Sequence, residues 1–205
     1  MTDRYGSMEE LYTEEPRAHY KLTTRPQPDS RVLVVSPHGG SIEWLTSEIA
    51  DTVAGETFKF HDFAGRLPED NFARLHVTSG NYDCLAVEAL NQDSLYTLTV
   101  HGCIGHTGGK VTYLGGKDDA GRELVRKHLE RAGFTVQDAP PHLSGMADDN
   151  IVNCNQRGKG IQLELSSALR RSFIEEGRPS GGIGSFQRYC QALRSALSEL
   201  SGEPI

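Results

Sequence analysis

Short runs of apolar and β-branched residues alternate with helix-patterned stretches along most of this 205-residue chain. The clearest run covers residues 32–36, and apolar residues spaced as on one face of a helix follow it over residues 42–53. Strands that alternate with helices indicate a mixed, largely parallel, twisted α/β sheet flanked by helices, with ligands bound at the carboxyl ends of strands. The same patterns predict further strands at 57–60, 74–78, 95–100, 111–114, 135–137 and 160–165, and further helices at 8–12, 82–90, 120–132, 167–176 and 187–200.

The length suits a single domain with a substantial core. Residues 1–30 are polar and end in the turn-rich stretch RPQPD, so they are expected to form a surface arm. Residues 31–205 are expected to form the domain that carries the function. We expect the protein to be a monomer.

Charge and composition limit the classes of partner. The net charge is -7, which argues against a general nucleic-acid or anionic-membrane surface, because either needs a basic face. An acidic ligand would therefore have to meet a local positive patch. The sequence has no apolar run near the roughly 20 residues that span a bilayer and no secretion signal, so a cytoplasmic protein is expected. Its four cysteines lack a C-x-x-C pair and are expected to be free thiols.

Unusual polar residues mark three of the predicted strands. His38 follows the first strand, His101 follows the strand at 95–100, and Glu164 lies within the strand at 160–165. In a parallel sheet both histidines would leave from the carboxyl edge. Two glycines after His38 would let Glu43, in the first turn of the next helix, fold back towards it. Two imidazoles and a carboxylate form a typical catalytic zinc set with a position left for water, so we predict that His38, Glu43 and His101 bind the metal.

Each of these residues also has a structural alternative. A histidine after a strand can serve the fold alone, Glu43 can complement a helix dipole, and His101 can bond its own loop. Glu164 is harder to explain in this way, because alternation along the strand places Gln162 and Glu164 on one face and the apolar residues on the other. An exposed edge strand is the alternative for this pair.

Five segments add a specific resemblance: PHGGSIEWLTSEIA at 37–50, LHVTS at 75–79, VHGCIG at 100–105, LGGKD at 114–118 and NIVNCNQRGKGIQLELSSALR at 150–170. In this order they resemble the phage-related poly-γ-glutamate hydrolase family, which is similar in fold to zinc carboxypeptidases and amidohydrolases. The resemblance implies that His38, Glu43 and His101 bind zinc and that Glu164 is the general base. It also implies endo-type hydrolysis of γ-glutamyl amide bonds in poly-γ-glutamate to shorter oligomers. The spacing of His38 and Glu43 is longer than the H-x-x-E of ordinary carboxypeptidases.

Such a polymer carries a carboxylate on every unit, so cations near the motifs are candidates to bind it. Arginine forms forked, charge-assisted bonds to carboxylates. Arg157 lies closest to the motif and is expected to take part in catalysis. Arg170, Lys110 and Lys117 are expected to bind substrate, and His76 to line the cleft or support a metal ligand.

Three other functions remain open from the sequence. The first is an amidase of the same architecture that acts on another γ-glutamyl or cell-wall peptide. The second is a non-catalytic binding module of the same fold. The third is a cysteine hydrolase in which Cys103 acts with His101 or His106. If a phage encodes the chain, release at host lysis would bring it to an extracellular polymer.

Overall fold

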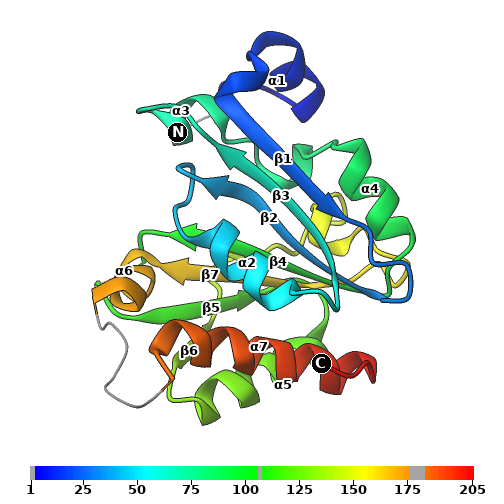
Figure 1. Cartoon of the computed structure of the whole chain (residues 1–205), viewed down its shortest axis with the longest axis vertical. Helices are drawn as coiled ribbons and strands as arrows, with labels where there is room; N and C mark the ends of the chain where they lie inside the picture. The colour runs from blue at the N-terminus through cyan, green and yellow to red at the C-terminus, as the bar shows by residue number, and fades with distance from the viewer. Residues whose placement is uncertain (1–2, 106–107, 176–182) are drawn as a thin grey trace.

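The computed structural model describes residues 3–105, 108–175 and 183–205. Over these residues seven strands form one mixed sheet in the order β1-β3-β2-β4-β7-β5-β6 (Figure 1). Pairs β2–β3, β2–β4, β4–β7 and β5–β6 are parallel, and pairs β1–β3 and β5–β7 are antiparallel. The predicted α/β class is confirmed. The strands are β1 (Tyr20–Arg25), β2 (Val32–Gly40), β3 (Lys59–Gly65), β4 (Tyr96–Cys103), β5 (Val111–Gly115), β6 (Thr135–Asp138) and β7 (Ile161–Ser166).

Helices pack on both faces of this sheet (Figure 1). None of the helices in the described ranges is long and apolar enough to cross a membrane. The α-helices are α1 (Met8–Glu14), α2 (Thr46–Ala54), α3 (Asn71–Leu75), α4 (Leu85–Gln92), α5 (Asp119–Arg131), α6 (Ser167–Glu175) and α7 (Ser185–Ser201). Short 3-10 turns are η1 (Arg17–His19), η2 (Ser79–Asn81), η3 (Pro141–Leu143) and η4 (Ile151–Asn153).

The central strand β2 explains why its sequence is a continuous apolar run. Val32 and Val34 pack in the core formed with α2, α5, α6 and α7. Leu33 and Val35 pack in the second core, which contains residues of α1, α3 and α4. Because successive side chains point to opposite faces, a strand covered on both sides needs apolar residues at every position.

The predicted strand at 74–78 is wrong. Residues 71–75 form helix α3, and the chain then runs as an extended connection through Val77. Leu75 and Val77 are fully buried while His76 is partly exposed, so the alternating pattern is real, but β3 and β4 pair with other neighbours. Burial of the last residue of a helix and of Val77 in the connection after it produced the same sequence pattern as a strand.

Residues 3–30 differ from the expected surface arm. Helix α1 buries Met8 and Leu11 completely, and β1 joins the edge of the sheet antiparallel to β3. Tyr5, Met8, Leu11 and Tyr20 of this polar segment face the core beside α3 and α4. A mostly polar edge strand is compatible with this role, because one of its faces and its outer edge meet solvent.

Strand β2 is the point of the sheet from which later strands are added on both sides. The chain adds β3 on one side of β2 and β4 on the other. Pairing of β2 with β4 extends only from Val32 to Val35, and its register with β3 shifts between Ser36 and Gly39. Strands β2 and β4 therefore diverge towards their carboxyl ends (Figure 1). In open α/β sheets, ligands bind at such a switch point.

A buried histidine next to this region predicts a pH-dependent stability. His61 on β3 is fully buried, with Thr24 and Cys84 beside its ring nitrogens, and burial lowers the pKa of His61 to about 4. The unfolded chain then binds a proton between pH 6.5 and pH 4 that the folded chain does not, so stability falls as the pH falls through this window. The whole loss is on the order of 3 kcal/mol.

The variant His61→Gln cannot bind this proton. We expect the free energy of urea unfolding to depend less steeply on pH between 6.5 and 4 in the variant than in the parent. Comparison of the two slopes separates this effect from any packing change, which shifts stability at all pH values. Parallel slopes would contradict the assignment.

Candidate active site

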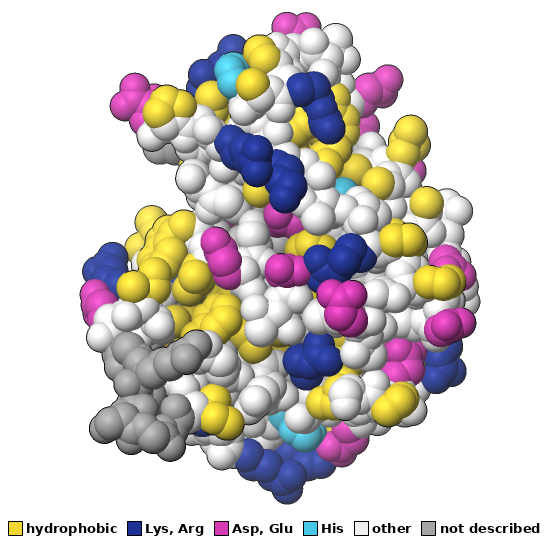
Figure 2. Space-filling view, viewed as in Figure 1, with side chains coloured by type: hydrophobic (Ala, Val, Ile, Leu, Met, Phe, Trp, Pro, Cys, Tyr) yellow, Lys and Arg dark blue, Asp and Glu magenta, His cyan; other side chains and the backbone are white. Residues whose placement is uncertain are grey.

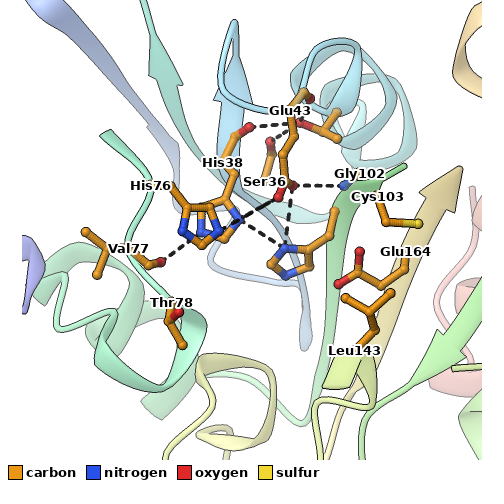
Figure 3. Close-up of polar contacts among 12 residues, drawn as sticks. Ser36, His38, Glu43, His76, Val77, Thr78, Gly102, Cys103, Leu143 and Glu164 are labelled. Carbon is orange, nitrogen blue, oxygen red and sulfur yellow. Dashed lines mark hydrogen bonds and ion pairs between the residues drawn. The ribbon is translucent and has the colours of Figure 1, made fainter. Parts of the chain in front are cut away.

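His38 lies near the end of β2, where the register shifts. Its Nε2 donates a hydrogen bond to the carbonyl oxygen of Val77 at 2.8 Å. In a neutral imidazole this leaves Nδ1 as the unprotonated nitrogen. That atom lies 3.2 Å from Nδ1 of His101 and 3.2 Å from Oε1 of Glu43 (Figure 3). His38 therefore directs a lone pair towards two other potential ligands.

Glu43 lies in the turn before α2, not in the first turn of that helix as expected. Helix α2 begins at Thr46, after Leu45 in a left-handed conformation (φ 73°). The turn is closed by hydrogen bonds from the backbone N–H of Glu43 to the His38 carbonyl (2.9 Å) and from the Thr46 hydroxyl to the Glu43 carbonyl (2.7 Å). This turn, rather than helical geometry, brings the Glu43 carboxylate back to His38.

The two glycines after His38 have separate structural reasons. A Cβ atom on Gly39 would lie 2.1 Å from the Ser47 hydroxyl and 2.2 Å from Oδ1 of Asp62. Gly40 has a φ of +62°, a conformation that side chains disfavour. The first glycine admits α2 close to the strand, and the second starts the turn that carries Glu43.

His101 approaches the same point from β4. Its Nδ1 lies 3.7 Å from Oε2 of Glu43, and that oxygen accepts a hydrogen bond from the backbone N–H of Gly102 at 2.8 Å. The Nε2 of His101 is buried and has no hydrogen-bond partner among the described residues. His38 and His101 were expected just after their strands, but each lies within its strand, two residues before the last one.

The three ligand atoms have separations suited to a tetrahedral metal. Metal–ligand bonds of 2.0–2.1 Å place tetrahedral ligand atoms about 3.4 Å apart. The Nδ1 atom of His38 lies 3.2 Å from Glu43 Oε1 and 3.2 Å from His101 Nδ1, close to that value, and His101 Nδ1 lies 3.7 Å from the other carboxylate oxygen, Oε2. His76 offers an alternative third ligand, since its Nε2 lies 4.0 Å from Oε1 of Glu43 and the set His38, Glu43 and His76 lies within 4.8 Å.

Glu164 lies across from these residues on β7. It is the register partner of His101 in the neighbouring strand, and Figure 3 shows it on the opposite side of the cluster from Val77. Gln162 donates from Nε2 to Oε1 of Glu164 at 3.1 Å, so the predicted pairing of these two side chains is confirmed. Gln162 is held in turn by Leu143 O (3.0 Å) and Asn150 Nδ2 (3.2 Å). One oxygen of Glu164 is thus fixed by a chain of amides.

The two carboxylates have opposite electrostatic environments. Burial alone would raise the pKa of Glu43, but the adjacent imidazoles of His38 and His101 hold it well below the usual range. Burial and the nearby charge of Glu43 raise the pKa of Glu164 well above its usual value. Two acidic groups with pKa values pushed apart are typical of a site that uses one as an ion and the other for proton transfer.

These residues open into a cleft of about 800 Å³. Figure 2 shows the surface indented on the side where β2 and β4 end. Exposed apolar side chains of Trp44, Phe72 and Ile104 contribute to its walls. The polar lining includes His38, Glu43, His76, His101, Asn150, Gln162, Glu164, Ser167 and Arg170.

The model of the poly-γ-glutamate hydrolase family matches residues 5–192. The chain belongs to this family. It is 33% identical to the SPbeta prophage-derived UPF0714 protein YoqZ of Bacillus subtilis, over 96% of this chain and 72% of the relative.

Two solved structures are similar over nearly their whole length. A bacteriophage poly-γ-glutamate hydrolase shares 31% identity at a TM-score of 0.87, covering 98% of this chain and 99% of that one. A zinc-free apo form of YNDL shares 26% identity at a TM-score of 0.85, covering 97% of this chain and 99% of that one. Their agreement with this chain supports the mixed seven-stranded fold.

In this member of the poly-γ-glutamate hydrolase family, Arg170 lines the cleft but is committed to the backbone. Its guanidinium donates to the carbonyl oxygens of Trp44 (2.8 Å), Leu165 (3.2 Å) and Cys103 (3.2 Å). A Cβ on Gly102 would lie 2.5 Å from its Cζ atom, so that glycine makes room for the guanidinium. Arg170 ties together three segments of the cleft wall.

The other predicted cations lie outside the cleft lining. Arg157 pairs with Asp118 at 2.7 Å and stacks 4.6 Å from the ring centre of Tyr96, at the end of β4 opposite to His101. Lys117 pairs with Asp148, and Lys110 is not part of the lining. Proximity to the motif in sequence therefore did not place Arg157 beside the metal-ligand cluster, because the loop before β7 lies at the amino end of the strand.

Cys103 lines the cleft, but its environment does not favour a nucleophile. Burial and the charge of Glu164 raise the pKa of Cys103 to about 12. A thiol with this pKa is protonated at neutral pH, and the thiolate is the reactive form. The alternative partner His106 lies outside the described residues.

Sequence reasoning missed two groups that support the site. The carbonyl of Val77 orients His38, and Asn150 holds Gln162. A backbone carbonyl leaves no signal in a sequence. Asn150 is the first residue of the segment NIVNCNQRGKG, which resembles the family, and this position is the sequence signal for its role.

Proposed function

We propose that the protein is a zinc-dependent hydrolase that cuts γ-glutamyl amide bonds within poly-γ-glutamate and releases shorter oligomers. The observation that carries this proposal is the meeting of His38, Glu43 and His101 at one point of a cleft that also contains the buried Glu164. Membership of the poly-γ-glutamate hydrolase family supports the reaction and the substrate. The zinc-free form of a similar protein supports the choice of metal.

The residues of the cluster fit a zinc ion. Imidazole nitrogen and carboxylate oxygen are ordinary zinc ligands, and three protein ligands leave a position for water or substrate. The His38 ring donates its other nitrogen to a backbone carbonyl, as metal-binding imidazoles usually do. The depressed pKa of Glu43 keeps its carboxylate ionised and able to bind a cation.

When bound at these residues, zinc would polarise the amide carbonyl and make water a better nucleophile at neutral pH. Glu164 would accept the proton of the attacking water and deliver it to the departing nitrogen. Burial favours the protonated form of Glu164, which suits the second of these transfers. Gln162 would keep the carboxyl oriented between the two transfers by holding its Oε1.

The cation content of the cleft favours cleavage inside a chain. Arg170 is the one lysine or arginine among the described lining residues, and backbone carbonyls already accept from its Nε and both terminal nitrogens. An enzyme that removes terminal units would need cationic hydrogen-bond donors, not already bound to the protein, for the two carboxylates of such a unit. The acidic protein would then bind its acidic polymer through short-range contacts with the cleft rather than by long-range attraction.

Metal removal gives the test. Treatment with a chelator is expected to abolish cleavage of poly-γ-glutamate, and return of zinc, but not of magnesium, to restore it. The size distribution of products at early times should shift to intermediate lengths, as internal cleavage requires. Full activity in verified metal-free protein would refute zinc dependence, and steady release of single glutamates would refute the endo mode. Preferred turnover of cell-wall peptides would reassign the substrate.

The place of action is part of the same proposal. One relative is derived from a prophage. A phage enzyme synthesised in the cytoplasm and released at lysis would reach a polymer outside the cell. Activity in the medium only after lysis of producing cells would support this route.

A further inference from the structure

The segment before α1 reaches the metal-ligand cluster through Asp3. Its Oδ1 accepts a hydrogen bond from Nδ1 of His76 at 2.7 Å, and its Oδ2 accepts one from the backbone N–H of Thr78 at 2.6 Å. Burial would raise the pKa of Asp3, but these hydrogen bonds lower it, so the carboxylate is ionised. One side chain thus holds the His76 ring and the Thr78 backbone, the residues on either side of Val77.

Val77 is the residue that orients His38. Its carbonyl accepts the proton of His38 Nε2, and in the neutral ring this leaves Nδ1 unprotonated towards Glu43 and His101. An imidazole binds a cation through its unprotonated nitrogen, and the hydrogen bond of the other nitrogen decides which one that is.

The same segment also packs against the ring of His38. The His76 ring lies 4.1 Å from the His38 ring, centre to centre, and Phe72 stacks on His76 at 4.5 Å. His38 is therefore fixed at its edge by Val77 and at its face by His76. Both contacts depend on where residues 76–78 are held.

We propose that Asp3 is a positioning residue of the metal site: by fixing residues 76–78, it keeps the Val77 carbonyl against His38 and presents His38 Nδ1 to the cation. The identity of the cation as zinc rests on the proposed function. The orientation of His38 does not, because the hydrogen bonds that set it lie within the protein chain.

Two measurements test this role. In metal-free protein, ring-nitrogen NMR should show His38 of the parent as the Nε2–H tautomer, and Asp3→Ala should show a mixture of tautomers. In competition with a chromophoric chelator, Asp3→Ala should bind zinc about 10- to 100-fold more weakly, the usual effect of losing a group that orients a ligand. Asp3→Asn retains one carbonyl oxygen, so its loss should be smaller; it also serves the test if Asp3→Ala does not fold.

Asp83→Ala is the matched control. Asp83 accepts hydrogen bonds from the backbone N–H groups of Met8 (2.5 Å) and Glu9 (3.2 Å), so it anchors the same N-terminal segment without a hydrogen bond to residues 76–78. This variant should keep the His38 tautomer and zinc affinity of the parent. Equal effects of Asp83→Ala and Asp3→Ala, or parental tautomer and affinity in both Asp3 variants, would overturn the proposal. A parent protein that bound no zinc would refute the proposed function, while the tautomer comparison would still decide the role of Asp3.

Discussion

Replacing Glu164 by glutamine is expected to lower kcat on poly-γ-glutamate by about 10² to 10⁴, the usual contribution of general acid–base catalysis. Glutamine preserves the size of the side chain and can still accept the hydrogen bond from Gln162 through its carbonyl oxygen. It cannot take up a proton from water. Bound zinc and polymer affinity should remain close to those of the parent, because Glu164 is not one of the three predicted ligands.

The neighbouring amide provides a control for Glu164. Gln162→Leu removes the hydrogen bond to Glu164 and keeps Glu164 as the proton acceptor. Gln162→Leu should therefore reduce kcat less than Glu164→Gln does. Near-parental turnover by Glu164→Gln would make Glu164 a structural residue. Loss of zinc from this variant would make it a ligand and reopen the assignment of Glu43.

His101→Ala is expected to abolish hydrolysis and to weaken zinc binding by more than about 100-fold, since loss of an outer partner alone costs 10- to 100-fold. Removal of the imidazole takes one of three ligand atoms from the cluster, while the apolar faces of β4 remain in the core. Metal content after dialysis and circular dichroism of the same samples measure the two consequences separately.

His76→Ala distinguishes the two possible ligand sets. If His38, Glu43 and His101 bind the metal, His76→Ala should lower zinc affinity by no more than about 10-fold, as an indirect effect on His38. If the set is His38, Glu43 and His76, the two variants should exchange their phenotypes. Retention of stoichiometric zinc by both variants would exclude either histidine as a required ligand.

The sequence by itself determined the features that depend on neighbouring residues, such as strand burial, side-chain alternation and helix ends. The continuous apolar run of β2 reported a strand buried on both faces, and alternation in β7 placed Gln162 and Glu164 together. Helix α5 begins after Asp118, whose side chain accepts from the N–H of Gly121, and ends before Gly133 with a φ of +84°. Cap and glycine preferences depend on neighbouring residues and can be recognised without the fold.

The tertiary structure decided features that depend on distant partners. The alternating segment at 74–78 is the end of α3 and the connection after it, because β3 and β4 pair with other strands, and sequence alternation reports burial rather than pairing. Arg157 is close in sequence to β7 but lies far from the metal-ligand cluster. The loop that carries it precedes β7 and therefore meets the amino end of the strand, beside Tyr96, whereas His101 lies near the carboxyl end of β4. Asp3 meets His76 across 73 positions of chain, and the bond that sets the His38 ring comes from a backbone carbonyl. Side-chain chemistry can thus be read from the sequence, whereas the groups that orient it come from packing between segments, which only the folded chain brings together.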